Sequence, residues 1–312
     1  MLLKEFPDLG WLKQQIDQRF QQRRAFNNLP LETDGFPNVI INTTIKEAYR
    51  PDIPGPISLF LNNTGTSYCT ADGRKVCVNE EYYFITNRQQ PYTLEIESRQ
   101  PVETFNIHIG EHFSEGVLSA LLTPADKILN DQLQQSVHTV AFHNRLYRRD
   151  DHFNELVHSL QQLQTATTFN KLLFEERMEK LLLHLLLQHR SVLKQADSLP
   201  PVKRSTKLEL YRRLSMVTDY IHSCGNRPVE LDEMAAVACL SKYHFLRLFK
   251  LAFGLSPYQY IQQLRLEKAR QLLTRSSLPV QDIAGRVGFE NSQSFSRLFY
   301  RRFGVYPSQY RA

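Results

Sequence analysis

The chain has 312 residues, of which 42% are hydrophobic and 22% are charged, a composition that excludes a disordered or fibrous protein and suggests two domains. Residues 201–312 contain 18 Lys and Arg against 8 Asp and Glu, whereas residues 1–200 contain 20 against 24. This basic C-terminal third indicates a polyanionic partner for that part alone, although many soluble domains are basic without one.

The N-terminal part begins without an export signal, because acidic residues stand in Met1–Asp8 where a signal peptide needs a basic start and an apolar run. The most apolar run, Leu181–Leu187, is far too short to cross a bilayer. We therefore expect a cytoplasmic protein without membrane contact. Apolar residues at helical spacing then predict an amphipathic helix over residues 5–25.

A series of short strands is expected between residues 37 and 113, where runs rich in Val, Ile, Tyr, Phe and Thr alternate with turn residues. Asp72-Gly73 between two such runs is typical of a β-hairpin. Several short strands at this spacing suggest a small β-barrel or sandwich. The expected strands are Asn38–Thr44, Ile57–Asn62, Ser67–Thr70, Lys75–Val78, Glu81–Thr86, Tyr92–Glu97 and Glu103–Ile109.

Helical periodicity returns after residue 114. The segment Phe153–His189 is rich in Leu and free of Gly and Pro, and its apolar positions fit two packed helices. These helices either pair with a second copy of the chain or cover the barrel, and the periodicity favours neither. The stretch Ser198–Lys207, with two adjacent prolines, is typical of an interdomain linker.

The last hundred residues contain an internal repeat. The sixteen positions Phe245–Tyr260 recur fifty residues later as Phe295–Tyr310, with nine identities. Upstream, Leu231–Leu240 matches Val280–Phe289, and the second copy carries one extra residue near Glu290. The identities fall on Phe, Tyr, Gly, Pro, Arg, Leu and Gln positions, several of them rare residue types, so they predict two copies of one structural unit.

Each copy has the form of a helix-turn-helix unit. A short helix carries a small residue, Ala235 or Ala284, where the second helix must approach closely. In the turn, Gly288 suits a positive φ, and the second helix is expected to begin at a hydroxyl cap, Ser241 or Ser292. Between the units, residues 257–274 predict one amphipathic helix. It would hold two recognition helices about 34 Å apart if both enter one face of a duplex.

The second helix of each unit has a core face and an outward face, which follow from a rotation of about 100° per residue. Arg and Gln can contact guanine and adenine edges in the major groove. The alternative is a solvated face whose Arg binds a nearby carboxylate, but the same outward Arg in both copies of a basic domain favours DNA. The core positions are Phe245, Leu248, Phe249, Phe295, Leu298 and Phe299, and the outward ones are Tyr243, Arg247, Lys250, Gln293, Arg297 and Tyr300.

Six segments carry a resemblance to a known family: Ser241–Lys250, Phe253–Pro257, Arg265–Leu273, Ile283–Phe289, Phe295–Phe299 and Phe303–Pro307. Through them, residues 207–312 resemble the DNA-binding domain of the AraC/XylS family of bacterial transcription regulators. The resemblance implies seven helices, with two helix-turn-helix units joined by a long helix. It places the base-reading positions on Tyr243, Leu246, Arg247, Ser292, Gln293 and Arg297.

Leu246 departs from the polar residue that the family often has at its position, which reduces readout there to a thymine-methyl contact. Faces, caps and resemblance together give one set of expected DNA-binding residues. They are Ser241, Lys242, Tyr243, Leu246, Arg247, Lys250, Asn291, Ser292, Gln293, Ser296 and Arg297.

The N-terminal region resembles the family's cupin-like sensor domain more weakly. The expected fold class is therefore α+β, with an N-terminal cupin-like β-barrel with flanking helices and a C-terminal all-α domain. Residues 1–190 would sense and dimerise, the helical part at about 150–190 serving dimerisation. Residues 191–206 would form the linker, and residues 207–312 the DNA-binding domain.

Metal binding is not expected in this region. Residues 87–92 have no histidine where metal-binding cupins carry ligands, and the four cysteines, Cys69, Cys77, Cys224 and Cys239, form no Cys-x-x-Cys pair. Buried free thiols in a reducing cytosol are expected instead. The sequence His108-Ile-Gly-Glu-His112 has the spacing of a zinc peptidase motif, but it follows a strand pattern rather than the helix that motif needs.

Asn106 and His108 share one face of the strand that ends near residue 109. They are candidate effector contacts if that face lines the barrel interior, and have no such role if it faces solvent.

Together these features predict a sequence-specific transcription regulator, most often an activator in this family, that binds double-stranded promoter DNA. We expect a homodimer that contacts RNA polymerase and responds to a small-molecule effector, with no catalytic residues and no cofactor. The alternatives are a metal-dependent cupin enzyme fused to a DNA-binding module, or a ligand-independent regulator whose N-terminal domain binds other proteins.

Overall fold

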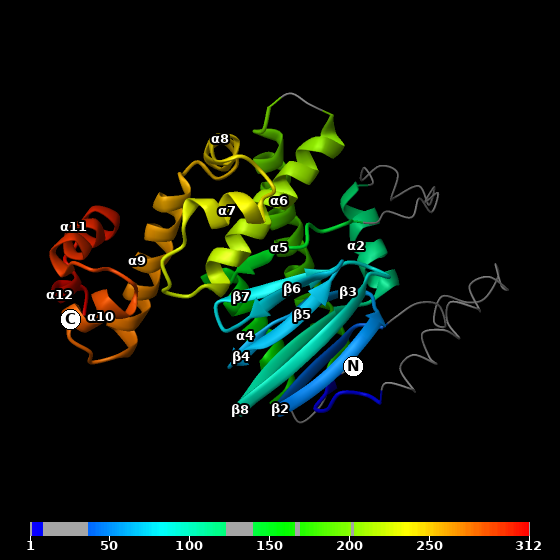
Figure 1. The fold of residues 1–312 in the computed structure, drawn as a ribbon. Coiled ribbons are helices and arrows are strands. Elements are labelled where there is room, and N and C mark those ends of the chain that lie inside the picture. Colours follow the sequence, from blue (N-terminus) through cyan, green and yellow to red (C-terminus); the bar gives the residue numbers. More distant parts are fainter. Residues whose placement is uncertain (1, 9–36, 123–139, 166–168, 201–202, 312) are drawn as a thin grey trace, which may run out of the picture. The chain divides into compact units, whose positions relative to one another are not determined.

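The computed structural model describes residues 2–8, 37–122, 140–165, 169–200 and 203–311 (Figure 1). The chain divides into two compact units, Met1–Val192 and Leu193–Ala312. The first combines a sheet with helices and the second is helical, so the expected α+β class is confirmed. Among the residues described, no helix is both long and apolar enough to cross a membrane. Most of the helix expected over residues 5–25 lies outside the described residues.

The sheet of the first unit is built around two long antiparallel strands, β2 (Val39–Pro54) and β8 (Pro91–Ile109), which run side by side in Figure 1. The other edge of β8 pairs in turn with three shorter strands, so β8 organises the sheet. The remaining strands are β1 (Leu2–Leu3), β3 (Ile57–Phe60), β4 (Asn62–Thr64), β5 (Ser67–Ala71), β6 (Arg74–Val78), β7 (Tyr82–Thr86) and β9 (Leu146–Arg148).

The closed barrel expected from the sequence is wrong for the part of the chain that is described. The pairing path β1-β2-β8-β3-β7-β9 has two free ends, whereas a barrel needs its first and last strands to pair. The sheet is therefore open. Its outermost strands are only two and three residues long, and β1 pairs with β2 at Ile40 and Ile41 alone.

Two strands expected on either side of Pro101 are one strand, β8. The proline and the polar residues before it suggested an interruption. However, Pro101 falls in the register break between the pairs Ile45↔Val102 and Glu47↔Glu97. A bulge there tolerates a residue without an N–H, so the strand continues through it.

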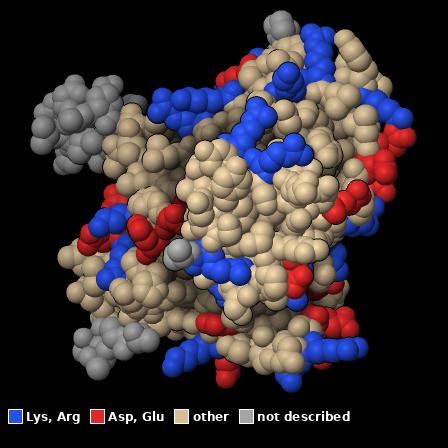
Figure 2. Space-filling view, turned by 90° about the vertical axis from the view of Figure 1, so that its left-hand side faces the viewer, with Lys and Arg blue, Asp and Glu red and all other residues tan. Residues whose placement is uncertain are grey.

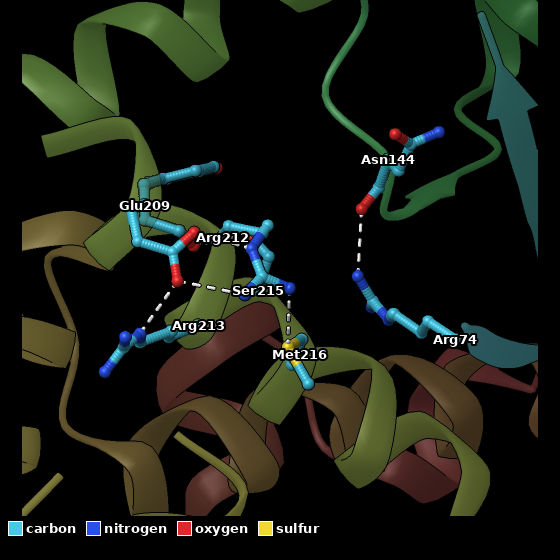
Figure 3. A network of polar contacts seen from close by, with 8 residues as sticks. Arg74, Asn144, Glu209, Arg212, Arg213, Ser215 and Met216 are labelled. Carbon is cyan, nitrogen blue, oxygen red and sulfur yellow. Dashed lines mark hydrogen bonds and ion pairs between the residues drawn. The ribbon is translucent and has the colours of Figure 1, made fainter. Parts of the chain in front are cut away.

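The predicted β-hairpin at Asp72-Gly73 is confirmed. Ala71 pairs with Arg74, which leaves a two-residue loop, and φ is 50° at Asp72 and 70° at Gly73. Two positive φ values are those of a type I′ turn, whose twist matches that of the strands. Arg74 also donates to the Asn144 carbonyl at 2.9 Å, which ties the hairpin to the segment before β9 (Figure 3).

Helices α4 (Asp151–Thr165) and α5 (Lys171–Asp197) are the two helices predicted from the Leu-rich segment, and α5 extends further than expected. Tyr83 of β7 stacks on Phe153 of α4 with ring centroids 4.1 Å apart, and Asn42 of β2 donates to Gln164 of α4 at 2.7 Å. These contacts place α4 against the sheet. A shorter helix, α2 (Glu111–Leu122), follows β8 directly.

The second unit contains the seven helices that the resemblance implies. Because α5 ends at Asp197 and α6 begins at Arg204, the first and last residues of the linker expected over 191–206 are helical. The helices are α6 (Arg204–Ser223), α7 (Leu231–Val237), α8 (Lys242–Phe253), α9 (Pro257–Arg275), α10 (Val280–Arg286), α11 (Ser292–Phe303) and α12 (Pro307–Tyr310).

The long connector α9 begins at a well-defined cap. The Ser256 side chain accepts from the Gln259 N–H while Gln259 reaches back to the Ser256 N–H, a capping box reinforced by Pro257 at the first helical position. In Figure 1, α9 runs between the two helix-turn-helix units, α7–α8 and α10–α11. The second helix-turn-helix unit packs on α9 through a hydrophobic cluster that includes Phe295 and Phe299.

Candidate nucleic-acid interface

The two recognition helices, α8 and α11, begin at different kinds of cap. Ser241 accepts a hydrogen bond from the His244 N–H, as expected. In the second unit the expected cap at Ser292 is wrong. The Asn291 side chain accepts from the N–H groups of Gln293 at 2.8 Å and Ser294 at 3.2 Å, so Ser292 is the first helical residue. Asn291 stands fifty residues after Ser241, the same spacing as between Phe245 and Phe295, so the two caps occupy equivalent positions of the repeat.

The turn before each recognition helix needs a positive φ. It is 89° at Gly288, as predicted, and 52° at the matching Cys239, which the sequence analysis did not single out. Arg265 of α9 donates to the Gly288 carbonyl at 2.8 Å, and its Cζ would lie 2.9 Å from a Cβ added at Gly288. Gly288 therefore satisfies both the backbone conformation and the close approach of the connector.

The expected core faces are buried. Phe245 and Phe249 of α8 and Phe295 and Phe299 of α11 are inaccessible to solvent, and Leu248 is also buried. Leu298 is the exception, because it is only partly buried. Each recognition helix is thus rotated about its own axis as the repeat predicted, and this determines which side chains point outward.

The outward face of each recognition helix is exposed. Tyr243, Arg247 and Lys250 are exposed on α8. Their counterparts on α11, Gln293, Arg297 and Tyr300, are exposed too.

Neither Arg247 nor Arg297 forms an ion pair or side-chain hydrogen bond with any residue that the structure describes. Both guanidinium groups are therefore available for a ligand.

Three other basic side chains of the C-terminal unit have carboxylate partners. Glu209 of α6 accepts from Arg212 at 2.7 Å and from Arg213 at 2.9 Å (Figure 3). The hydrogen bonds from Arg212 and Arg213 lower the pKa of Glu209 to about 2. Lys242, expected to touch DNA, forms an ion pair of 2.5 Å with Asp232. Lys242 must therefore exchange this partner before it can contact a phosphate.

The remaining expected contact residues lie at the edges of these faces. Ser296 donates to the carbonyl of Ser292 in its own helix, which leaves its oxygen able to accept. Leu246 is partly exposed and lines a groove of about 680 Å³ between the two helix-turn-helix units, with Tyr258 of α9 and Ser294 of α11 among the other lining residues. Leu246 is therefore on the flank of α8 that faces the second unit.

Figure 2 shows Lys and Arg side chains separated by uncharged and acidic ones on the face that lies to the left in Figure 1, so the basic side chains do not cover that face continuously.

Asn106 and His108, the candidate effector contacts, are buried rather than solvent-exposed, with 2% and 6% of their surface accessible. His108 Nδ1 lies 2.8 Å from the Ser58 hydroxyl, and its ring is 6.3 Å from that of Phe60, centroid to centroid. Burial lowers the pKa of His108 to about 4, so the ring is neutral at pH 7. Among the described residues, the Asn106 amide nitrogen has no hydrogen-bond partner.

Two further polar residues in the same place were missed by the sequence analysis. Ser58 of β3 pairs across the sheet with His108 on one side and with Thr86 of β7 on the other. Both are fully buried, and the Thr86 hydroxyl has no hydrogen-bond partner among the residues described. A polar residue at alternate positions of neighbouring strands was the available signal, but the strand pairing that aligns them is not visible in one sequence.

The residues of the zinc-like spacing have other roles. Glu111 forms an ion pair with Arg88, whose Nε lies 2.9 Å from Oε1, and accepts a hydrogen bond from Arg88 Nη2 at 3.1 Å. In the described parts of the chain, no group of three His, Cys, Asp or Glu side chains could hold a metal ion. All four cysteines are free, but the expected burial holds for Cys69 alone, since Cys77 and Cys224 are partly buried and Cys239 is exposed.

Comparisons with known proteins give the same assignment for the C-terminal region. Residues 234–312 match the model of a family described as a helix-turn-helix domain. The chain is 34% identical over 114 residues to the probable transcriptional regulator LumQ of Photobacterium leiognathi, covering 35% of this chain and 46% of that protein. It is 33% identical over 153 residues to the transcriptional activator RhaR of Shigella boydii, covering 49% of each.

Solved structures also match the chain, over different shares of its length. An AraC-type transcriptional regulator from Chromobacterium violaceum is 29% identical, covering 32% of this chain and 88% of that one, with a TM-score of 0.31. The chain spans about half the length, or less, of the curated relatives it matches. The family model is the match that gives a position in the chain, residues 234–312, which include α8 and α11.

Proposed function

Because the C-terminal region is an AraC-type helix-turn-helix domain, we propose that this chain is a transcription regulator that reads double-stranded promoter DNA through α8 and α11. The main observation that supports this proposal is that Arg247 and Arg297 occupy the same outward position in the two repeats. Among the described residues, both lack a protein partner. A free guanidinium on an exposed helix face suits guanine, which offers two acceptors in the major groove.

The test compares free and paired arginines of the same domain. Arg247→Ala and Arg297→Ala should each weaken binding to the specific site by about 1–3 kcal/mol while leaving binding to unrelated DNA less affected. Arg212→Ala is the matched control, because Arg212 is already bound to Glu209. Binding is measured on the purified full chain with a promoter found by genomic footprinting, alongside a shuffled duplex.

Two results would count against the proposal. Equal losses for all three variants would mean that only total charge matters, and unchanged base preference in both Arg247→Ala and Arg297→Ala would mean that neither side chain reads DNA.

We further propose that the sheet unit senses a small, neutral effector through Asn106, His108, Ser58 and Thr86. Two buried polar atoms without partners among the described residues support this, because such groups are costly unless a ligand or water satisfies them. Thermal shift of the chain against sugars, polyols and neutral amino acids tests it. A stabilising compound should lose its effect in Asn106→Leu, whose own melting temperature serves as the control.

The remaining features of the proposal follow from the regulator itself. It would act in the cytoplasm, where promoter DNA lies, as a homodimer that activates transcription by contacting RNA polymerase. The relatives it matches are transcription regulators, and we propose no enzymatic activity. Sedimentation of the free chain and in vitro transcription with purified polymerase test these points separately.

A further inference from the structure

Two of the positions at which the two helix-turn-helix units differ carry exposed tyrosines in the second unit. At the positions of Lys250 and Ser256 in the first unit, the second unit has Tyr300 and Tyr306. The two tyrosine rings stack on each other, with centroids 4.6 Å apart and planes inclined by 25°. Their exposed fractions are 47% and 46%, so the pair belongs to the surface rather than to the core.

The pair continues the outward face of α11. Tyr300 follows Gln293 by seven residues and Arg297 by three, a spacing that keeps all three side chains on one face of a helix. The aromatic residues that form the core of this unit, Phe299 and Phe303, contact Tyr310 instead. The tyrosine pair is therefore separate from the aromatic core and adjacent to the proposed base-reading side chains.

Tyr306 is held in place by the backbone around it. α11 ends at Gly304, which has a φ of 75°, and α12 begins at Pro307. The Tyr306 N–H also donates to the Gln309 side chain at 3.3 Å. Tyr306 thus supports one side of the Tyr300 ring, which limits the freedom that Tyr300 would lose on binding a ligand.

We propose that Tyr300, supported by Tyr306, donates a hydrogen bond from its hydroxyl to a backbone phosphate of the DNA bound by α11. This inference rests on the proposed function. Tyrosine hydroxyls are regular phosphate ligands, and the end of a recognition helix passes the sugar-phosphate backbone as it leaves the major groove. Continuity with Gln293 and Arg297 makes DNA the partner that this surface fits.

The two helix-turn-helix units would then contact the DNA backbone through different side chains, Lys250 and Tyr300, at equivalent positions. Lys250 neutralises a phosphate and releases counterions, which contributes about 0.9 to the slope of log affinity against log salt. Tyr300 is neutral, so its contact leaves that slope unchanged. The contact made by Tyr300 should therefore keep more of its contribution to affinity than the contact made by Lys250 as the salt concentration rises.

The experiment compares salt titrations of specific binding by the full chain for four variants. Lys250→Gln should weaken binding at low salt and reduce the slope by about 0.9. Tyr300→Phe, which removes only the hydroxyl, should weaken binding about three- to tenfold at every salt concentration, with the slope unchanged. Tyr306→Ala should reproduce part of this loss, whereas Tyr306→Phe keeps the stacked ring and should bind like the unaltered chain.

The outcomes separate the inference from the function on which it rests. If Arg297→Ala loses base preference but Tyr300→Phe binds DNA like the unaltered chain, the function stands and the phosphate contact is wrong. If Tyr300→Phe binds DNA normally but lowers transcription with purified polymerase, the tyrosine pair is a protein-docking surface and the inference is overturned. If neither Arg297→Ala nor Tyr300→Phe affects binding, the proposed function fails as well.

Discussion

Replacing Gly288 by alanine tests how the connector helix fixes the second recognition helix. The substitution forces a side chain into a φ of 89°, which costs about 1–2 kcal/mol in the left-handed region. The new Cβ would lie 2.9 Å from Arg265 Cζ, so the guanidinium must move away from the Gly288 carbonyl. Loss of that charged hydrogen bond adds about 1.5–3 kcal/mol.

The reduced freedom of the unfolded alanine chain offsets about 0.4–1 kcal/mol of this cost. The second helix-turn-helix unit should therefore lose about 1.5–4.6 kcal/mol of its free energy of unfolding, the sum of these contributions. Gly304→Ala is a matched control in the same unit, since Gly304 has a φ of 75° and nothing within 4 Å of an added Cβ. Its expected loss is only about 0–1.6 kcal/mol, from the backbone alone.

Hydrogen exchange of the α11 amides in the full chain measures the local opening free energy of each variant. The specific footprint should also shorten on the side read by α11 in Gly288→Ala and remain complete in Gly304→Ala. Opening free energies that differ by less than about 0.5 kcal/mol between the two variants would refute the role given to Arg265, because the backbone cost alone would then explain both.

Two further predictions concern a cap and a buried histidine. Asn291→Ala should destabilise α11 by about 0.5–2 kcal/mol in the same exchange measurement, because the Asn291 side chain accepts from two N–H groups. Ser292→Ala should change the stability of α11 little. A larger loss in Ser292→Ala than in Asn291→Ala would mean that Ser292 is the cap. The depressed pKa of His108, about 4, favours the neutral ring in the folded state, so its contribution to stability is complete above pH 6.5 and is lost as the pH falls toward 4. The free energy of unfolding of the sheet unit, measured by exchange of the β3 and β8 amides, should therefore fall by an amount on the order of 3 kcal/mol over that pH window. His108→Gln should make this free energy depend less on pH. An unchanged pH dependence in His108→Gln would assign it to other groups, such as His184, whose pKa burial also lowers.

The internal repeat made the C-terminal helical unit predictable at the level of single side chains. Two aligned copies fix the helical phase, so the core role of Phe245 and Phe295 and the exposure of Arg247 and Arg297 followed from counting residues. Gly288 was predictable because a positive φ selects glycine. Cys239 was not, since nothing in its residue type indicates that it shares that conformation.

The sheet unit was predictable only locally. The hairpin at Asp72-Gly73 depends on neighbouring residues and was correct, whereas closure of the sheet depends on which distant strands pair. The same limit explains why Ser58 and Thr86 were missed beside His108. Their alignment is a property of the pairing of β3, β7 and β8, which one sequence with no repeat in that region does not encode visibly.

The connector α9 determines whether the two unequal recognition helices act together. Its 19 residues span about 28 Å at 1.5 Å per residue, somewhat less than one turn of DNA. The Ser256 cap fixes its start beside the first unit, and Arg265 binds the turn that precedes the second recognition helix. Once one unit is bound, the other is therefore held near its own site, and its binding becomes an intramolecular step. Weakening either unit should then lower the affinity of the whole domain, which is why a single substitution in α11 can be measured on the full chain.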